Sequence, residues 1–418
     1  MTYWFNAPGL RERAPLGSTR GARGLSSTIF VPKLFIGVGA IPEAGGGVVN
    51  YIAPLCARKR AFIVTDTSVR TLADRVANSF KTRQFATEVW DGALPEVPIA
   101  TAEACAQAMT RFEPDLIVAV GGGSAMDMAK AAWILYERPD LNLRNFSPMA
   151  PLNLRKKALL LAVPTTSGTG SEVTSAAVLT DDVGDRKVPI ASRELFPDFA
   201  AIDPTFAMGM PAKLTAGTGL DVLAHAIDCV TSPTTNDITD ALALRAIQLV
   251  FKFLPRAYRD PHDREARLRM HIAATMAGIA FGNAACTLTH SMGHALGKVF
   301  HVHHGVAVGM FVPYTQQFYA AVTDKHVDVG KALELKGRTT DAKLVSLVAA
   351  VRKLLRSVDV PLTLKDLGIA RVQLEQQMPK LVRDSIEDPD TFGSPRWISE
   401  GQCEKLFWYA YEGKDVDF

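Results

Sequence analysis

The hydrophobic pattern of this 418-residue chain changes near residue 208, and that change constrains the fold more than any other feature. Before it, short apolar runs at 59–66, 115–122 and 158–165 alternate with stretches of helical spacing. Strands that alternate with helices predict a parallel sheet covered by helices on both faces. After it, apolar residues recur every three or four positions, which predicts helices alone. We therefore expect an α/β domain followed by an all-helical domain.

The length of the chain favours more than one domain, and the pattern divides it into three parts. We expect an N-terminal arm over 1–27, an α/β domain over 28–208 and a helical domain over 209–418. Helical spacing within the α/β domain covers 69–82 and 101–112. The helices expected after the boundary span 215–230, 237–256, 264–282, 286–298, 304–320 and 341–358.

Composition excludes several classes of protein. The chain is 48% hydrophobic and 21% charged, as globular proteins are. A formal net charge of +3 gives no reason to expect nucleic acid or an acidic membrane surface as a partner. No apolar stretch approaches the roughly 18 residues of a membrane-spanning helix. The five cysteines are widely spaced and contain no CxxC pair, which favours free thiols in a reducing compartment, the cytoplasm.

The arm over 1–27 combines four arginines and one glutamate with proline, glycine and serine. A transit peptide has a similar charge balance, but Trp4, Phe5, Pro8 and Pro15 interrupt an amphipathic helix. We therefore expect an extended arm that lies on a partner subunit. A homodimer or a larger homo-oligomer is the assembly that this arm predicts.

Histidines are concentrated in one short segment, and a carboxylate–histidine pair precedes it. Asp221 and His225 are four residues apart, so both side chains project from one face of a helix. Five of the nine histidines fall within fifteen residues, namely His290, His294, His301, His303 and His304. One carboxylate with several imidazoles suits Fe(II), Zn(II) or a similar ion. Spacing alone does not tell which of the five bind it.

Two glycine-rich segments follow predicted strands and have the character of phosphate-binding loops. In 118–132, three glycines and a serine separate a strand from a helix, so backbone N–H groups and the helix dipole can approach a phosphate. The segment 164–174 also leaves a strand end and adds hydroxyl groups. The first segment has neither the P-loop spacing nor the usual GxGxxG fingerprint, so a plain tight turn is the alternative there.

Asp66 ends the strand predicted over 59–66. A carboxylate at this place accepts hydrogen bonds from both ribose hydroxyls and repels a 2′-phosphate, which favours NAD over NADP. Its alternative role is to cap the helix that follows Thr67 and Ser68. Nucleotide loops in one domain and metal ligands in the next predict a cleft between them, in which hydride is transferred at a carbinol carbon.

Five motifs, taken in order, carry a resemblance to a known family. They are GGGSAMDMAK (121–130), PTTSGTGSEVT (164–174), GTGLDVLAHAID (217–228), THSMGHALG with the following HHG (289–305), and SPR (394–396). From about residue 30 to its end, the chain resembles the iron-dependent (group III) alcohol dehydrogenases. That family includes lactaldehyde reductases, 1,3-propanediol dehydrogenases and bacterial butanol and methanol dehydrogenases. The resemblance implies a dehydroquinate-synthase-like fold.

The resemblance also implies roles for individual residues. The family's metal ligands match Asp221, His225, His290 and His304. His294 matches a histidine beside the nicotinamide that relays a proton, and Phe281 matches a residue of the substrate pocket. The positions that match the family's NAD-binding residues are Asp66, Gly122, Gly123, Ser124, Thr165, Thr166, Thr174 and Lys187.

These expectations describe an NAD-dependent dehydrogenase of a small primary alcohol or diol that also works as an aldehyde reductase. Fe(II), or alternatively Zn(II), would act as a Lewis acid on the alcohol oxygen while hydride passes to the nicotinamide. A lyase of the dehydroquinate-synthase type is one alternative, but it needs Lys and Arg for a phosphorylated substrate, and the helical half offers no such cluster around the ligands. A non-catalytic scaffold protein is another alternative. Such a protein would be expected to have lost one of the metal ligands, and all four are present in this chain.

Overall fold

The computed structural model describes residues 28–146, 151–181, 184 and 186–418, and the arm expected over 1–27 lies outside them. Two compact units comprise residues 30–209 and 210–418. Among the described residues, no helix combines the length and the apolar character needed to cross a membrane.

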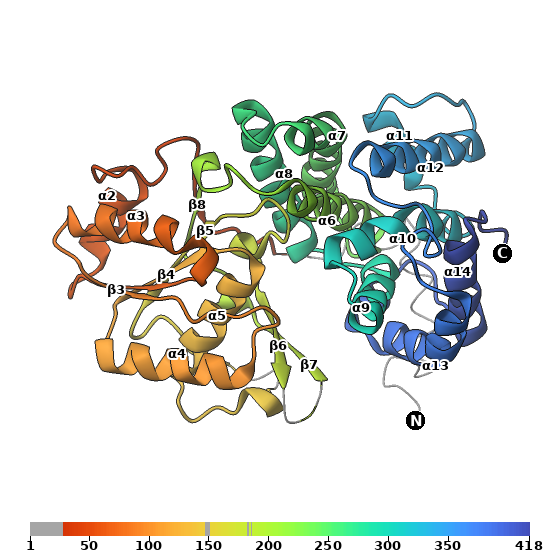
Figure 1. The fold of residues 1–418 in the computed structure, drawn as a ribbon. Coiled ribbons are helices and arrows are strands. Elements are labelled where there is room, and N and C mark those ends of the chain that lie inside the picture. The colour runs from red at the N-terminus through yellow and green to blue at the C-terminus, as the bar shows by residue number, and fades with distance from the viewer. Residues whose placement is uncertain (1–27, 147–150, 182–183, 185) are drawn as a thin grey trace. The chain divides into compact units, whose positions relative to one another are not determined.

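The unit 30–209 is built on a six-stranded, fully parallel sheet (Figure 1). In spatial order its strands are β1 (Lys33–Ile36), β8 (Phe199–Ile202), β5 (Leu159–Pro164), β4 (Leu116–Gly121), β2 (Arg60–Val64) and β3 (Ala86–Trp90). The three apolar runs that the sequence singles out correspond to β2, β4 and β5. Every residue of β4 is buried, as expected for a central strand with helices on both faces.

Alternate side chains of the sheet enter two separate cores. Ile117 and Ala119 of β4 belong to the core formed with α4 and α5, whereas Val118 and Val120 belong to the core formed with α2 and α3. These helices are α2 (Gly47–Ile52), α3 (Arg70–Lys81), α4 (Ile99–Phe112) and α5 (Gly123–Glu137). Figure 1 shows the two pairs on opposite sides of the strands. The predicted parallel sheet with two covered faces is therefore confirmed.

An antiparallel hairpin of β6 (Ala176–Asp181) and β7 (Arg186–Ala191) lies outside the main sheet, and the strand–helix alternation does not predict it. Leu179, Val188 and Ile190 point from the hairpin into the core beside α4 and α5. A two-stranded hairpin is marginally stable in water, so this packing is what holds it in place.

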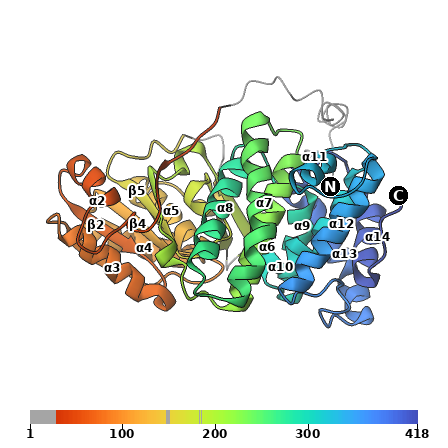
Figure 2. The same ribbon diagram turned by 90° about the horizontal axis from the view of Figure 1, so that it is seen from above.

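The unit 210–418 is helical, as the sequence predicts. Its helices are α6 (Ala212–Thr231), α7 (Asp237–Arg259), α8 (Arg264–Gly282), α9 (Leu288–Phe300), α10 (His304–Tyr319), α11 (His326–Ala332), α12 (Thr340–Ser357), α13 (Arg371–Glu387) and α14 (Glu400–Glu412). α6 packs against α7, α8, α9 and α10, and Figure 2 shows these helices side by side. Every residue from Thr215 to Thr231 is buried. Polar side chains on such a helix need a partner or a ligand.

Candidate metal centre and nucleotide loops

Asp221 and His225 lie one turn apart on α6, with 3.8 Å between Oδ1 of the carboxylate and Nδ1 of the imidazole. His304 begins α10, which reaches α6 through two glycines. A Cβ on Gly305 would lie 2.0 Å from the carbonyl oxygen of Gly217, so the two backbones can meet only where a side chain is missing. Because of that contact, His304 lies next to Asp221, with 3.1 Å between His304 Nε2 and Asp221 Oδ1.

His290 completes a group of three imidazoles around one carboxylate oxygen. It lies in the first turn of α9, and its Nε2 is 3.8 Å from Asp221 Oδ1. The same oxygen is 3.8 Å from His225 Nδ1 and 3.1 Å from His304 Nε2. The four residues predicted as metal ligands therefore direct nitrogen and oxygen atoms to one place.

Three of these converging atoms lack the hydrogen bonds that buried polar atoms normally make. Asp221 Oδ1, His225 Nδ1 and His290 Nε2 are buried without a hydrogen-bond partner among the described residues. Each buried polar atom left unpaired costs roughly 1–3 kcal/mol. One carboxylate and three imidazoles form a donor set suited to Fe(II) or Zn(II), so the residues present fit a divalent ion.

The ionisation of the group also favours a cation. Burial raises the pKa of Asp221, but the surrounding imidazoles outweigh it and hold that pKa well below its usual value. Burial lowers the pKa of His225 to about 3 and lowers the pKa of His304 as well, so both imidazoles are neutral, as ligands must be. Burial acts the same way on His290, yet contacts with Cys286 and neighbouring carboxylates raise its pKa. A metal at Nε2 would take the place of that proton.

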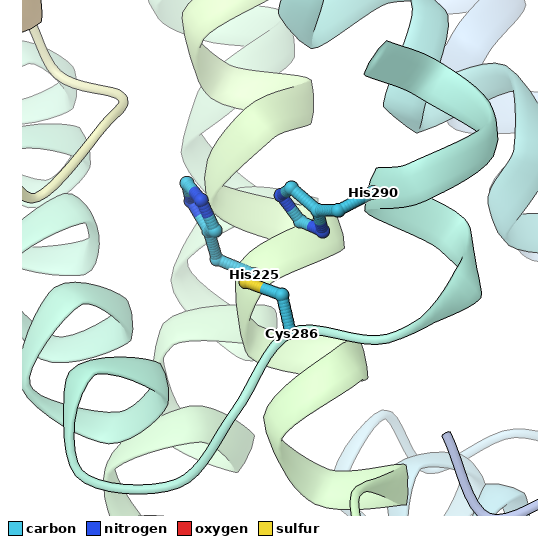
Figure 3. A group of neighbouring side chains, drawn as sticks. All are labelled: His225, Cys286 and His290. Atoms are coloured by element: carbon cyan, nitrogen blue, oxygen red, sulfur yellow. The ribbon is translucent and has the colours of Figure 1, made fainter. Parts of the chain in front are cut away.

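Two further side chains border the centre. Cys286 lies on the loop before α9, and its sulfur forms a group with a nitrogen of His225 and a nitrogen of His290, all within 4.8 Å of one another (Figure 3). Burial raises the pKa of the Cys286 thiol. Phe281, predicted to line the substrate pocket, stacks on His225 with ring centroids 4.0 Å apart. The sequence pattern does not mark Cys286, because a lone cysteine has no characteristic spacing.

His294 lies one turn after His290 but belongs to a different group. Its ring stacks on that of His304 with centroids 5.0 Å apart, and its Nδ1 is 2.9 Å from Asp388 Oδ2. Asp390 Oδ2 is 3.9 Å from the same nitrogen. Burial opposes protonation, but the bond to Asp388 raises the pKa of His294, while burial and Asp388 raise the pKa of Asp390 to about 6. This geometry supports a proton carrier next to the ligands.

The other two histidines of the segment lie outside the convergent group. His301 ends α9 in the left-handed conformation, with a φ of 54°. His303 precedes α10 and lies against Gly217, where a Cβ would be 2.5 Å from the imidazole ring. The fold thus distinguishes histidines that spacing alone leaves equivalent.

Two carboxylates that hydrogen-bond to His290 and His294 are not singled out by the sequence pattern. Asp228 lies on α6, and its Oδ2 is 2.7 Å from His290 Nδ1. Its spacing of three residues from His225 in GTGLDVLAHAID was a usable signal. Asp388 contacts His294 from a segment that is distant in sequence, so no local pattern could have identified it.

The two glycine-rich segments lie side by side within 30–209. The first turns from β4 into α5, with Gly122 at the N-cap. A Cβ on Gly122 would lie 3.3 Å from the side chain of Thr166, and one on Gly123 would lie 2.9 Å from that of Thr169, both in the second segment. A helix N-terminus beside a hydroxyl-rich loop is a favourable place for a phosphate.

Lys130, the last residue of GGGSAMDMAK, is buried and hydrogen-bonds to the end of the second segment and to the start of β6. Its buried ammonium group donates to the carbonyl oxygens of Ser171, Thr174 and Ala176 at 2.8, 2.9 and 2.9 Å. Burial lowers the pKa of Lys130 to about 8, with Asp127 opposing the shift. Thr174, a predicted cofactor contact, is therefore fixed through its backbone. No sequence pattern predicts this role of Lys130.

Asp66 follows β2, and each of its oxygens has a different environment. Oδ1 accepts a 2.8 Å hydrogen bond from the backbone N–H of Ser68, so Asp66 is the N-cap of the short 3-10 helix Thr67–Val69. Oδ2 faces the glycine loop, since a Cβ on Gly121 would lie 3.6 Å from it. Asp66 thus has a capping role, but it caps this short 3-10 helix and not α3, whose N-cap is Val69. The contact to ribose stays a prediction.

The other predicted nucleotide contacts are spread over the same unit. Ser124 is exposed in the first turn of α5, and Thr165 is buried, with its N–H donating to the Gly121 carbonyl at 2.9 Å. Lys187 lies on β7, where its ammonium group pairs with Glu96 and donates to a neighbouring threonine hydroxyl at 3.0 Å. These contacts account for the position of Lys187 within the unit, and its binding of a nucleotide stays a prediction.

Comparison with known proteins settles the family. Residues 32–204 match the sequence model of the iron-containing alcohol dehydrogenases, and residues 215–411 match that of the C-terminal part of the same family. An NADPH-dependent butanol dehydrogenase of Clostridium saccharobutylicum is 35% identical over 378 residues, which cover 90% of this chain and 97% of that protein. The chain belongs to the iron-containing alcohol dehydrogenase family.

Solved structures of the family have the same fold. An alcohol dehydrogenase from Oenococcus oeni superposes with a TM-score of 0.86 at 28% identity, over 92% of this chain and all of that one. A sulfoacetaldehyde reductase from Bifidobacterium kashiwanohense, solved with NAD⁺, has a TM-score of 0.82 at 28% identity, over 93% of this chain and 99% of that one. The fold implied by the sequence motifs is thereby confirmed.

Proposed function

We propose that this iron-containing alcohol dehydrogenase uses NAD to oxidise a small primary alcohol or diol and reduces the corresponding aldehyde in reverse. The observation that carries the proposal is the convergence of three imidazoles on Asp221 Oδ1, with buried donor atoms that lack protein partners. An ion held by Asp221, His225, His290 and His304 would supply a Lewis acid for the substrate oxygen. Iron follows from the family, and the donor set accepts zinc as well.

The protein's own groups would divide the remaining work. The carboxylate of Asp221 reduces the net charge of the centre, and Phe281 presents an apolar ring beside it. His294 would accept the alcohol proton at Nε2 while Asp388 holds the proton on Nδ1. On aldehyde reduction the same atom would return the proton. Since Asp388 fixes the orientation of the ring, the imidazole can exchange protons without turning.

Asp66 supports NAD as the cofactor in preference to NADP. One of its oxygens is engaged in capping, and the other faces the glycine loop and can accept bonds from a ribose. The Bifidobacterium reductase was solved with NAD⁺, whereas the Clostridium butanol dehydrogenase is NADPH-dependent, so the family accommodates both. The charge at position 66 is the feature of this chain that favours NAD.

The test is a panel of C1 to C6 alcohols, diols and hydroxy acids with NAD, after anaerobic reconstitution of the protein with Fe(II). We expect NADH formation with a subset of short primary alcohols, and NADH consumption with their aldehydes. A lyase would turn over substrate with no net change in NADH, and a scaffold protein would leave every compound unchanged. Absence of turnover on the whole panel with both Fe(II) and Zn(II) would refute the proposal.

The buried cysteines support a reducing compartment. Cys56, Cys105, Cys229, Cys286 and Cys403 are all free, so we place the protein in the cytoplasm. We also propose a homodimer or a larger homo-oligomer, on the strength of the N-terminal arm. Analytical ultracentrifugation of the full chain and of a variant starting at residue 28 tests that assembly, and a monomer in both cases would refute it.

A further inference from the structure

A buried carboxylate touches one candidate ligand without joining the convergent group. Asp228 is fully buried on α6, and its Oδ2 is 2.7 Å from His290 Nδ1. The same oxygen accepts a 3.0 Å hydrogen bond from the backbone N–H of Thr287, and Oδ1 accepts a 2.6 Å bond from the Thr287 hydroxyl. Asp228 takes no part in the groups of possible metal ligands found among the described residues. Its oxygens are directed at the start of α9.

We propose that Asp228 is a positioning residue that sets the tautomer and the ring orientation of His290 for metal binding. The inference rests on the proposed ligand set. A carboxylate beside Nδ1 requires the ring proton on that nitrogen, so Nδ1–H donates and Nε2 keeps its lone pair. Nε2 is the atom that lies 3.8 Å from Asp221 Oδ1. A carboxylate that accepts from a ligating imidazole in this way fixes the ring and raises its basicity.

The surroundings of Asp228 distinguish this role from simple attachment of one helix to another. A fully buried carboxylate is strongly unfavourable unless its oxygens are paired, and a neutral side chain could join α6 to α9 without that desolvation. The two bonds from Thr287 hold the carboxylate still. The carboxylate therefore hydrogen-bonds to a single imidazole, that of His290, which is a candidate ligand.

The test measures metal affinity and not turnover. Metal-free wild type, Asp228→Asn and Asp240→Asn are titrated with Co(II) and with Zn(II) in competition with a chelator of known affinity. Asp240 is a matched control, because it is a largely buried carboxylate on α7 that pairs with Lys325 at 2.6 Å and not with a candidate ligand. We expect Asp228→Asn to weaken metal binding by roughly 10–100-fold and to alter the Co(II) absorption spectrum. Asp240→Asn should match the wild type in both.

Asp228→Glu keeps the charge but moves it, so it should recover part of the affinity and still show an altered Co(II) spectrum. Wild-type affinity in Asp228→Asn would overturn the inference, as would an equal loss of affinity in Asp240→Asn. If Asp228→Asn does not fold, an unchanged Co(II) spectrum in Asp228→Glu overturns it instead.

A further variant keeps this inference separate from the proposed function. If His304→Ala retains metal, the ligand set itself is wrong. If His304→Ala loses metal while Asp228→Asn binds it normally, the ligand set stands and only the role of Asp228 fails.

Discussion

The candidate metal centre of 210–418 and the glycine-rich loops of 30–209 differ in whether their polar groups have hydrogen-bond partners within the protein. In 210–418, the donor atoms of Asp221, His225 and His290 are buried without hydrogen-bond partners among the described residues. In 30–209, the polar groups beside the glycine-rich loops are already bonded within the protein, as Lys130 is to three carbonyl groups and Asp66 is to a backbone N–H. The helical centre leaves donor atoms without protein partners, whereas the groups beside the glycine-rich loops are held by hydrogen bonds within the protein.

This difference determines how each unit should respond to substitution. Loss of one proposed ligand in the helical centre would leave too few donor atoms to hold an ion, so the site as a whole should be lost. A change in the nucleotide loops acts on a scaffold that keeps its own hydrogen bonds, so it should alter stability or cofactor preference by limited amounts. Substitutions in the two units therefore test the comparison directly.

The largest effect is expected from His304→Ala. The variant should lose stoichiometric metal after Fe(II) reconstitution, and turnover should fall by at least about 100-fold, because several kcal/mol of transition-state stabilisation depend on the Lewis acid. Metal content is measured by mass spectrometry of the desalted protein. His301→Asn is the matched control, since His301 is exposed and Asn tolerates its left-handed backbone. Metal retained in His304→Ala would show that the centre is complete without it.

His294→Gln should lower turnover while leaving metal content unchanged. A positioned acid–base group contributes roughly 10²–10⁴-fold in rate. Since the pKa of His294 is raised and the relay needs a neutral imidazole, wild-type alcohol oxidation should rise with pH through a value above that of an ordinary histidine. The variant should lack this rise. Loss of metal in His294→Gln would make His294 a ligand, and unchanged turnover would show that it only packs.

Lys130→Met tests whether the scaffold of the α/β unit depends on a buried charge. The folded pKa of Lys130, about 8, lies below its ordinary value of 10.5. Between these values the unfolded chain binds the extra proton, so the stability of the wild type rises with pH, by at most about 3 kcal/mol. Lys130→Met has no ammonium group at this position, so it lacks this dependence of stability on pH. The free energy of unfolding of both proteins is measured with denaturant at pH 7 and pH 10. The wild type should gain stability relative to Lys130→Met at pH 10. An equal difference in free energy at the two pH values would contradict this.

Asp66→Gly should raise the use of NADP relative to NAD by roughly tenfold, which corresponds to about 1.4 kcal/mol. The reason is the removal of a negative charge that repels a 2′-phosphate. The ratio of kcat/KM for the two cofactors is the measurement. Ser68→Ala keeps the carboxylate and the backbone N–H that it caps, so it should keep the wild-type preference. Equal use of both cofactors by the wild type would leave Asp66 with the capping role alone.

The smallest effect is expected from Cys286→Ser. Cys286 borders the centre but is absent from the proposed ligand set, so the variant should retain metal. The Co(II)-substituted wild type should lack the strong near-ultraviolet absorption of a thiolate ligand. If that band is present and disappears in Cys286→Ser, the helical centre has a sulfur donor as well.

The sequence predicts the layers of both units because each layer has a local periodicity. Six helices expected after the domain boundary have counterparts whose ends differ by at most three residues. The pair of Asp221 and His225 is equally local. His304 is different, because spacing does not distinguish it from His301 or His303. Only the family motif did so in the sequence, and in the structure the backbone contact at Gly305 does.

The features that the sequence does not predict depend on tertiary packing. Lys130 hydrogen-bonds to backbone carbonyl groups that are 41 and 44 residues away in the sequence. Any residue type can supply a backbone carbonyl, so these bonds produce no sequence pattern. The Asp388 carboxylate reaches His294 from the segment after α13. The β6–β7 hairpin was missed because strand–helix alternation describes the parallel sheet alone.

The backbone contact between Gly217 and Gly305 means that the four candidate ligands come together only when the helical unit has folded. α6 and α10 are distant in sequence, and a side chain on Gly305 would hold them apart. Before the two helices dock, the chain presents at most a pair of ligands on one helix, such as Asp221 with His225. The full donor set therefore exists only in the docked unit, so a divalent ion should bind the folded protein far more tightly than the unfolded chain.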